Sequence, residues 1–510
     1  MAPHPANPIP ARLLMWQRVR EYAVPPSMIE TATARRAVGD WAGACAAARI
    51  DVDLDLRAVR NRHGTELVTR LRADLRRLAP DLLRWHMPRI APDGRLRPGL
   101  TVPLACYPDL GPTAPQLVVR TPPAWADAGQ RMSLALWEGA GDDTRGQPPQ
   151  RGPRPPLRPR PHPHPHPDRR FRLDLHRHLW DVDRSGELAR RCGADEAPSA
   201  PSMAAPVRPA GPERSTALDS PWAVARWAAE AEVLLRAAGR TRGAFTVRLG
   251  TRSRAVLELV APDDSHAPAL RPLREGLPPQ EVAALPVLPE AAARVLPDLE
   301  LLRAGLVTAE RLHPLVAAVL APFGSAPPVA GSLPEPGDPH RVACRGEVHR
   351  IALRDGRLTA VDHDPDELRR EELLVALGGP ALPCLRAIDA VHRDPQALPA
   401  VRERLGHGDV AGALAVVEGL LGPGAVLRDG PLREALRTAA ARRIDHGLFR
   451  SGLVAVHPAV GSGTGPERGD GASVVREAGA GHRPRLDRRT PAAMRRKRDN
   501  RARPRTGLTR

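Results

Sequence analysis

The chain has 510 residues, with 76 Lys or Arg against 58 Asp or Glu, and a formal net charge of +18 at pH 7. Its single lysine, Lys497, argues against P-loop ATPases, kinases and pyridoxal phosphate enzymes, because each of these classes needs a lysine in its active site. Five scattered cysteines, no secretion signal and no long apolar run indicate a cytoplasmic protein without a disulfide framework or a membrane segment.

Helical and strand-like segments alternate with proline-rich stretches along the whole chain, which predicts an α+β fold. We expect small antiparallel hairpins packed with short Ala/Leu-rich helices in two or three domains, joined by Pro-rich linkers. The predicted parts are an N-terminal α+β domain (13–138), a Pro/Arg/His-rich linker (139–218) with a short ordered patch near 171–190, a central helix and hairpin domain (219–326), a linker (327–338), a C-terminal domain of a hairpin and helices (339–458) and a disordered basic tail (459–510).

The N-terminal part begins with predicted helices over 27–38 and 41–49, and the second of these is capped by Asp40. A similar sequence recurs at Gly408-Asp409, where Asp409 is expected to cap a helix over 409–421. We interpret both as ordinary capped helices rather than as units of a repeat array. The other predicted elements here are a strand over 51–56, a helix capped by Thr65, and strands over 116–120 and 131–137.

Two segments of the long linker contain metal-ligand residue types. His162, His164 and His166 alternate with proline, which spreads their rings apart, and a solvated linker is favoured. Asp181, Asp183 and Ser185 match the start of a calcium loop. The twelfth position of that loop is Cys192 and not the bidentate Glu, so a chance resemblance is favoured over calcium. The central domain is expected to follow with a helix over 222–238 and a hairpin formed by 245–249 and 255–260.

The segment from 342 to 379 has the strongest local signals in the chain. Asp355-Gly356 lies between two alternating runs and predicts a two-residue hairpin turn, because both residues tolerate positive φ. Equal distances from that turn place His349 opposite Asp362, and we expect a hydrogen bond between these two side chains. Asp364 is the predicted cap of the helix that follows, which ends before Gly378.

The same hairpin contains the candidate site. A tight turn at Arg345-Gly346 would place Cys344, Glu347, His349 and Asp362 on one face. Cys344, His349 and Asp362 could then form a cysteine nucleophile with its base and orienting carboxylate. Alternatively, the Cys344 thiol and the imidazoles of the hairpin could hold zinc if Cys384 and His392 join them. One of these imidazoles is His363, which follows Asp362 in the sequence. A purely structural His–Asp pair is the favoured interpretation.

The basic charge is concentrated at the C-terminal end, where residues 481–510 have 12 Arg or Lys and 2 Asp. Such a tail could bind nucleic acid without sequence specificity, by counterion release. The leading functional expectation is a non-catalytic protein that acts through contacts with an unknown protein partner and uses no cofactor. A hydrolase or metal protein centred on His349, and a nucleic-acid binder, remain as alternatives.

Overall fold

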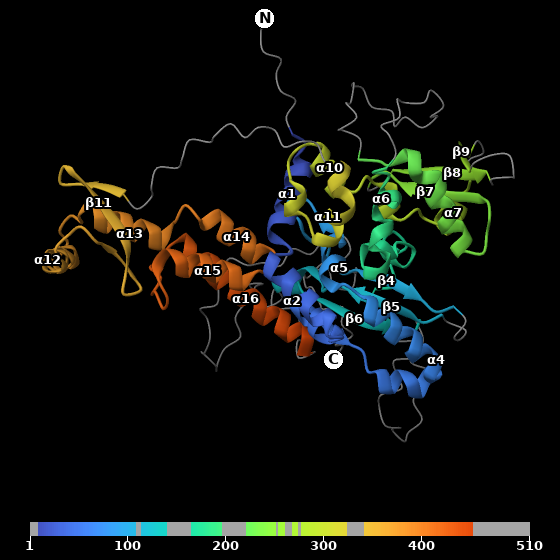
Figure 1. Ribbon diagram of the computed structural model, residues 1–510, viewed down its shortest axis with the longest axis horizontal. Helices are drawn as coiled ribbons and strands as arrows, with labels where there is room; N and C mark the ends of the chain where they lie inside the picture. Colours follow the sequence, from blue (N-terminus) through green and yellow to red (C-terminus); the bar gives the residue numbers. More distant parts are fainter. Residues whose placement is uncertain are drawn as a thin grey trace, which may run out of the picture.

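The computed structural model describes the chain in eight ranges, which are 9–108, 114–139, 165–195, 221–250, 253–260, 268–273, 277–323 and 341–451. Within them the fold is α+β, as predicted, with several small sheets and many short helices (Figure 1). The predicted tail (459–510) and most of the predicted linkers lie outside the described ranges. No helix in the described ranges is long and apolar enough to cross a membrane.

A four-stranded sheet covered by helices forms the first part of the fold. The strand order is β1-β6-β5-β4, with β1 parallel to β6 and the other neighbours antiparallel. β5 and β6 confirm the two strands predicted there, whereas β4 was not predicted because Pro103 weakens its strand signal. Proline is tolerated because β4 is an edge strand with a bulge after Pro103. The elements are Ala11–Tyr22 (α1), Pro26–Ala37 (α2), Trp41–Ala47 (α3), Ile50–Asp53 (β1), Leu56–Arg77 (α4), Pro80–His86 (α5), Arg89–Ile90 (β2), Arg95–Leu96 (β3), Thr101–Cys106 (β4), Gln116–Arg120 (β5) and Met132–Trp137 (β6).

A second group of elements packs beside the first. Its three-stranded sheet has the order β7-β8-β9, and the β7–β8 pair confirms the predicted hairpin. The helix predicted from residue 222 begins only at Trp227, after a short 3-10 turn. The elements are Leu188–Cys192 (α6), Trp227–Ala237 (α7), Gly243–Arg248 (β7), Arg254–Val260 (β8), Ala269–Pro272 (β9), Pro279–Ala284 (α8), Glu290–Ala293 (α9), Pro297–Arg303 (α10) and Pro314–Leu320 (α11).

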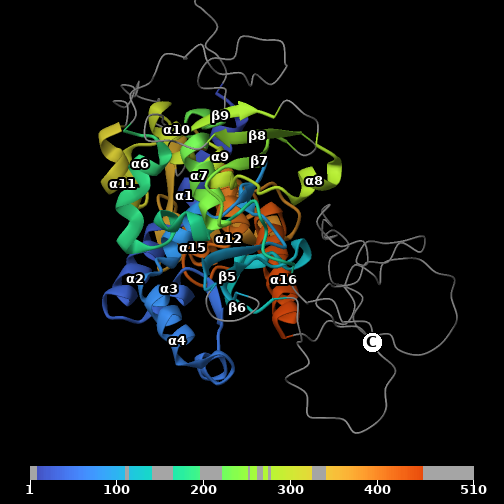
Figure 2. The ribbon, with the colours of Figure 1, turned by 90° about the vertical axis from the view of Figure 1, so that its right-hand side faces the viewer.

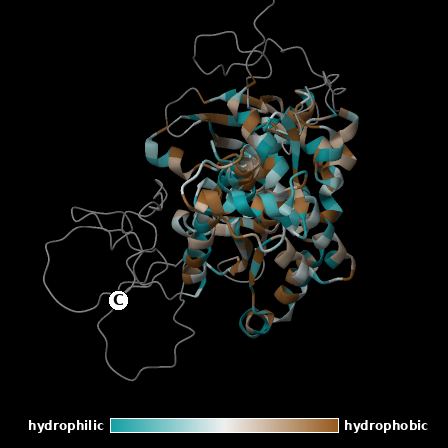
Figure 3. Cartoon of the chain, turned by 90° about the vertical axis from the view of Figure 1, so that its left-hand side faces the viewer, coloured by the Kyte–Doolittle hydropathy of each residue, from teal (hydrophilic) through white to brown (hydrophobic). Residues whose placement is uncertain are grey.

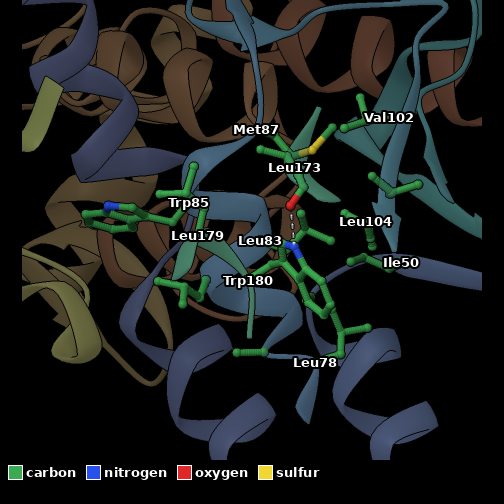
Figure 4. Packing of buried hydrophobic residues seen from close by; sticks show 14 of the residues in the cluster. Ile50, Leu78, Leu83, Trp85, Met87, Val102, Leu104, Leu173, Leu179 and Trp180 are labelled. Carbon is green, nitrogen blue, oxygen red and sulfur yellow. Dashed lines mark hydrogen bonds between the residues drawn. The ribbon is translucent and has the colours of Figure 1, made fainter. Parts of the chain in front are cut away.

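One hydrophobic core combines segments that are far apart in the sequence. It takes residues from 19–134, from 171–194 and from 299–320, so the packing crosses the predicted linker at 139–218. Trp180, from inside that linker, is fully buried in this core, and its indole Nε1 donates to the Leu173 carbonyl at 3.0 Å (Figure 4). Residues 165–170 of the linker also contact the first sheet, because the Asp168 amide donates to the Thr101 carbonyl at 2.8 Å.

A buried ion pair connects α1 to α10 within this core. Both the Nε and the Nη2 of Arg20 donate to the Asp298 carboxylate, at 2.8 and 2.7 Å. The Trp85 indole donates to the same carboxylate at 3.0 Å. All three side chains are almost completely buried, so residues near 20, 85 and 298 form one packed unit.

The C-terminal part consists of a hairpin arm, which we define as residues 341–393, and three further helices. Figure 1 shows the arm at one end of the molecule, beyond α14, α15 and α16. Hydrophilic and hydrophobic residues alternate along the elements, as expected when each element buries one face (Figure 3). The elements are Arg341–Cys344 (β10), Glu347–Arg354 (β11), Arg357–Ala360 (β12), Pro365–Ala376 (α12), Pro383–Arg393 (α13), Leu398–Gly406 (α14), Val410–Leu421 (α15) and Pro431–Ser451 (α16).

Local signals in the arm are confirmed. Asp355 and Gly356 form the two-residue turn, with φ of 53° and 74°, and Arg354 pairs with Arg357. The Asp364 carboxylate caps α12 by accepting from the Asp366 amide at 3.1 Å. The hairpin turn lies against the loop after α15, where a Cβ on Gly422 would be 1.7 Å from the Gly356 carbonyl oxygen.

The helices after the arm dock onto the N-terminal part. Arg49 donates to the His407 carbonyl at 3.0 Å, and the Arg450 guanidinium pairs with Asp53 at 2.6 Å. The His446 Nδ1 lies 3.0 Å from the Ala126 carbonyl oxygen. In Figure 2, α16 lies beside the first sheet, in agreement with these contacts. As predicted, Asp409 caps α15 by accepting from the Gly412 amide at 3.2 Å.

Candidate metal centre

Two cysteines and two histidines of the hairpin arm come together at one point. Cys344 ends β10, His349 lies in β11, His363 follows β12, and Cys384 lies in the first turn of α13. One potential ligand atom from each of the four residues lies within 4.8 Å of the other three. Two thiols and two imidazoles are therefore gathered from four separate positions in the arm.

The turn at Arg345 and Gly346 brings the first two residues together. Both turn residues have positive φ, 54° and 88°, and the strand register pairs Cys344 with Glu347. His349 is two residues beyond Glu347, so it shares a face with Cys344 because side chains alternate along a strand. This confirms the prediction that Cys344, Glu347 and His349 lie on one face.

The two histidines face each other across the centre of the cluster. The His349 Nδ1 is 2.6 Å from the His363 Nε2, and the rings cross at 70°. The outer nitrogens lie near carboxylates, since the His349 Nε2 is 3.5 Å from Glu347 and the His363 Nδ1 is 3.8 Å from Glu367. A histidine that binds a metal usually donates a hydrogen bond from its outer nitrogen to a carboxylate, and neither of these two contacts is as short as such a bond.

The two cysteines form the buried side of the cluster. Cys344 is 1% exposed and Cys384 is fully buried, and Ala360, Leu368 and Leu382 pack around them. Burial, together with the hydrogen-bonded Cys344 thiol, raises the pKa of Cys384 to about 11. A protonated thiol is therefore expected there at neutral pH without a metal, and a bound metal would displace that proton.

Asp362 does not join the site, and the predicted hydrogen bond to His349 is wrong. β12 ends at Ala360, so the ladder does not extend to an Asp362–His349 pair. The Asp362 carboxylate instead accepts a hydrogen bond from the Arg350 amide at 2.8 Å. This hydrogen bond, and secondly one from the Arg350 guanidinium, lower the pKa of Asp362. The triad of Cys344, His349 and Asp362 required for a cysteine nucleophile is therefore not assembled.

His392 does not belong to the cluster either. It lies in the same helix as Cys384 but eight residues later, which is about 12 Å along the helix axis. His363 supplies the second imidazole instead. The sequence shows His363 next to Asp362, but only the end of β12 turns its ring toward His349.

The calcium-loop resemblance at Asp181, Asp183 and Ser185 corresponds to a 3-10 helix over Val182–Glu187. The buried Asp181 carboxylate contacts Arg177 at 3.1 Å and also accepts from the Asp183 amide. The Ser185 hydroxyl donates to the Val182 carbonyl at 2.8 Å. The carboxylate oxygens of Asp181 are therefore occupied by contacts within the fold. The segment forms a capped 3-10 helix rather than a loop around an ion.

Comparison of the chain with models of protein families, with curated proteins and with solved structures finds no match. Function is therefore inferred from the residues of the cluster. Thiolate and imidazole donors together select zinc among the common biological metals, and two of each is a frequent set in structural zinc sites. Within the described ranges, these four residues form the cluster that best fits a metal ion.

Proposed function

We propose that this protein binds one zinc ion through Cys344, His349, His363 and Cys384, and that the ion holds the hairpin arm together. The observation that supports this is the convergence of two thiols and two imidazoles from four separate positions, all within 4.8 Å. Two of these donors are buried thiols next to two imidazoles, which is a frequent ligand set of structural zinc sites.

The cluster needs only small adjustments to surround the ion. Zinc lies about 2.3 Å from sulfur and about 2.0–2.1 Å from nitrogen, so tetrahedral donors are roughly 3.3–3.8 Å apart. The widest separation, within 4.8 Å, must shorten, and the 2.6 Å between the His349 and His363 nitrogens must lengthen. Each of these changes is of the order of 1 Å, which side-chain rotation can supply.

The proposed role of the ion is structural rather than catalytic. Four protein ligands complete the tetrahedral shell and leave no position for water or substrate. Near this centre, α12 and its C-cap residue expose the apolar side chains of Leu373, Leu374 and Leu377, which are 60%, 52% and 85% exposed. An arm that is held by a metal and presents apolar surface favours a non-catalytic function through protein contacts.

Metal analysis of the purified full-length chain tests the proposal. We expect one zinc per chain, and loss of the ion in Cys384→Ala and in His363→Ala. Cys106→Ala is the matched control, because Cys106 is exposed on β4 and distant in the sequence from the arm. His392→Ala should also keep the metal. A chain without zinc, or equal zinc in Cys384→Ala and Cys106→Ala, would contradict the proposal.

Cobalt provides a second measurement if a variant misfolds. Reconstitution of the wild-type chain with Co²⁺ should give the visible absorption of a tetrahedral site with thiolate ligands, and added Zn²⁺ should remove it. An octahedral spectrum without thiolate bands would show that the two cysteines are not ligands.

A further inference from the structure

A cavity of about 300 Å³ lies in the main core, outside the hairpin arm. It is bounded by α1, by the segment after α5, by residues 171–192 and by the segment from α9 to α10. Its volume is at the lower end of the range, about 300–1,000 Å³, that is usual for small-molecule sites. Among the described residues, its lining includes seven arginines and one acidic residue, Glu290.

Five of these arginines lie within 4 Å of a carboxylate, including Arg294 at 3.4 Å from Glu290 and Arg226 at 3.9 Å from Glu230. Arg12 pairs with Glu300, Arg20 with Asp298 at 2.7 Å, and Arg191 with Glu230 at 2.8 Å. Their charges are therefore satisfied within the fold and need no ligand.

Arg89 is different. It is 6% exposed, and its one hydrogen bond runs from Nη2 to the Arg84 carbonyl at 2.9 Å. The Nε and Nη1 of Arg89 have no hydrogen-bond partner in the part of the chain that the structure describes. Burial, and then the charge of Arg20, lower the pKa of Arg89 to about 9. The guanidinium therefore remains charged at neutral pH, and none of the described carboxylates lies against it.

Two histidines add further unused donors or acceptors to the same lining. His178 is 4% exposed, and its Nδ1 has no hydrogen-bond partner in the described chain. The Nε2 of His86, a half-buried residue, has no partner there either. Burial lowers the pKa of both imidazoles, which are neutral at pH 7, and a neutral imidazole can donate from one nitrogen.

Much of the remaining lining is apolar, although Arg97, Arg226, Arg294 and Glu290 also border it. Met15, Leu173, Leu179 and Leu188 are all buried and border the cavity together with Phe171. A ligand that fills this space must therefore combine an anionic group with an apolar body. Inorganic anions would satisfy the cation but would leave the apolar part of the cavity unfilled.

We propose that this cavity binds a small organic monoanion or phosphate monoester, with its anionic group at Arg89 and His178 and its apolar body against Phe171 and Leu179. The anion would accept hydrogen bonds from the guanidinium nitrogens that the fold leaves without partners. Such a site is independent of the zinc proposal, because the two involve separate residues and separate parts of the fold.

Thermal unfolding of the full-length protein with four probes tests this proposal. Benzoate and phenyl phosphate carry the required charge and apolar body, benzamide is the neutral analogue of benzoate, and inorganic phosphate lacks the body. We expect at least one of the two aromatic anions to raise Tm with increasing concentration, and benzamide and inorganic phosphate to have much weaker effects. Equal stabilisation by benzamide, stabilisation by inorganic phosphate alone, or no response to either aromatic anion would overturn the proposal.

Variants of Arg89 locate the site. Arg89→Met should weaken the response roughly 10- to 100-fold in apparent Kd, because it removes hydrogen bonds to a charged group. Without ligand, its Tm should not fall, since an uncompensated buried charge is removed. Arg76→Met is the matched control on the exposed surface of α4 and should respond like wild type. An unchanged response in Arg89→Met would overturn the assignment; if that variant fails to fold, Arg89→Gln, which also removes the charge, should show the same weakening.

Discussion

The ion pair between Arg20 and Asp298 provides a sharp test of how the chain is organised. Asp298 is fully buried and accepts three hydrogen bonds, two from Arg20 and one from the Trp85 indole. Asp298→Ala would leave the Arg20 guanidinium in the core with one hydrogen bond, from Nη1 to the Trp85 carbonyl at 2.7 Å. Breaking a buried pair by removing one partner typically costs about 3–5 kcal/mol, and we expect a loss of that size.

Unfolding in urea, followed by tryptophan fluorescence, measures this loss. The control is Glu66→Ala, which breaks the pair with Arg70 on the surface of α4, where the two side chains are 62% and 44% exposed. An exposed pair of this kind contributes about 0.3–0.5 kcal/mol. The double replacement Arg20→Met with Asp298→Leu should recover most of the stability, because it removes both charges together.

The outcome also distinguishes one shared core from separate domains. If residues 13–138 and 219–326 unfolded independently, Asp298→Ala would shift only part of the transition and would leave the N-terminal part as stable as before. A loss within about 1 kcal/mol of that in Glu66→Ala would refute the reasoning from burial.

Three further expectations concern acid stability, the hairpin contact and the tail. Burial opposes ionisation of Glu230, but hydrogen bonds from His176 and Arg191 outweigh it and lower the pKa of Glu230 to about 2. The contacts of Glu230 with His176 and Arg191 therefore contribute roughly 3 kcal/mol to the free energy of unfolding above about pH 4.5, and this contribution is lost as pH falls toward 2. Urea unfolding at a series of pH values should show a smaller loss of stability in Glu230→Gln than in wild type. Gly422→Ala should lower the free energy of unfolding in urea by at least about 2 kcal/mol, because φ at Gly422 is +88° and the new Cβ would clash with the Gly356 carbonyl. The control Gly419→Ala has open space around the new Cβ and should be neutral or stabilising. If residues 481–510 bind nucleic acid, gel-shift affinity should fall steeply with salt and disappear on their removal; undiminished binding would place the contact elsewhere.

Local sequence patterns alone determined several elements of this protein. Asp355-Gly356 specifies its turn because two adjacent residues tolerate positive φ, and Asp364 and Asp409 cap their helices through amides only two or three residues away. These interactions close within one turn of chain, so the sequence is sufficient to predict them. The shared face of Cys344 and His349 follows in the same way from strand alternation.

The candidate metal centre as a whole depended on the tertiary structure. The sequence contains Cys384 and His363, but their position relative to Cys344 depends on where β12 ends and how α13 packs, and alternation extended past Ala360 wrongly chose Asp362. The cavity proposed to bind an anion depended on the tertiary structure even more strongly. Arg89 is one of many arginines in the sequence, and it differs from Arg20 only because folding brings a carboxylate to one and none to the other. Such pairing joins residues hundreds of positions apart, and no local pattern records it.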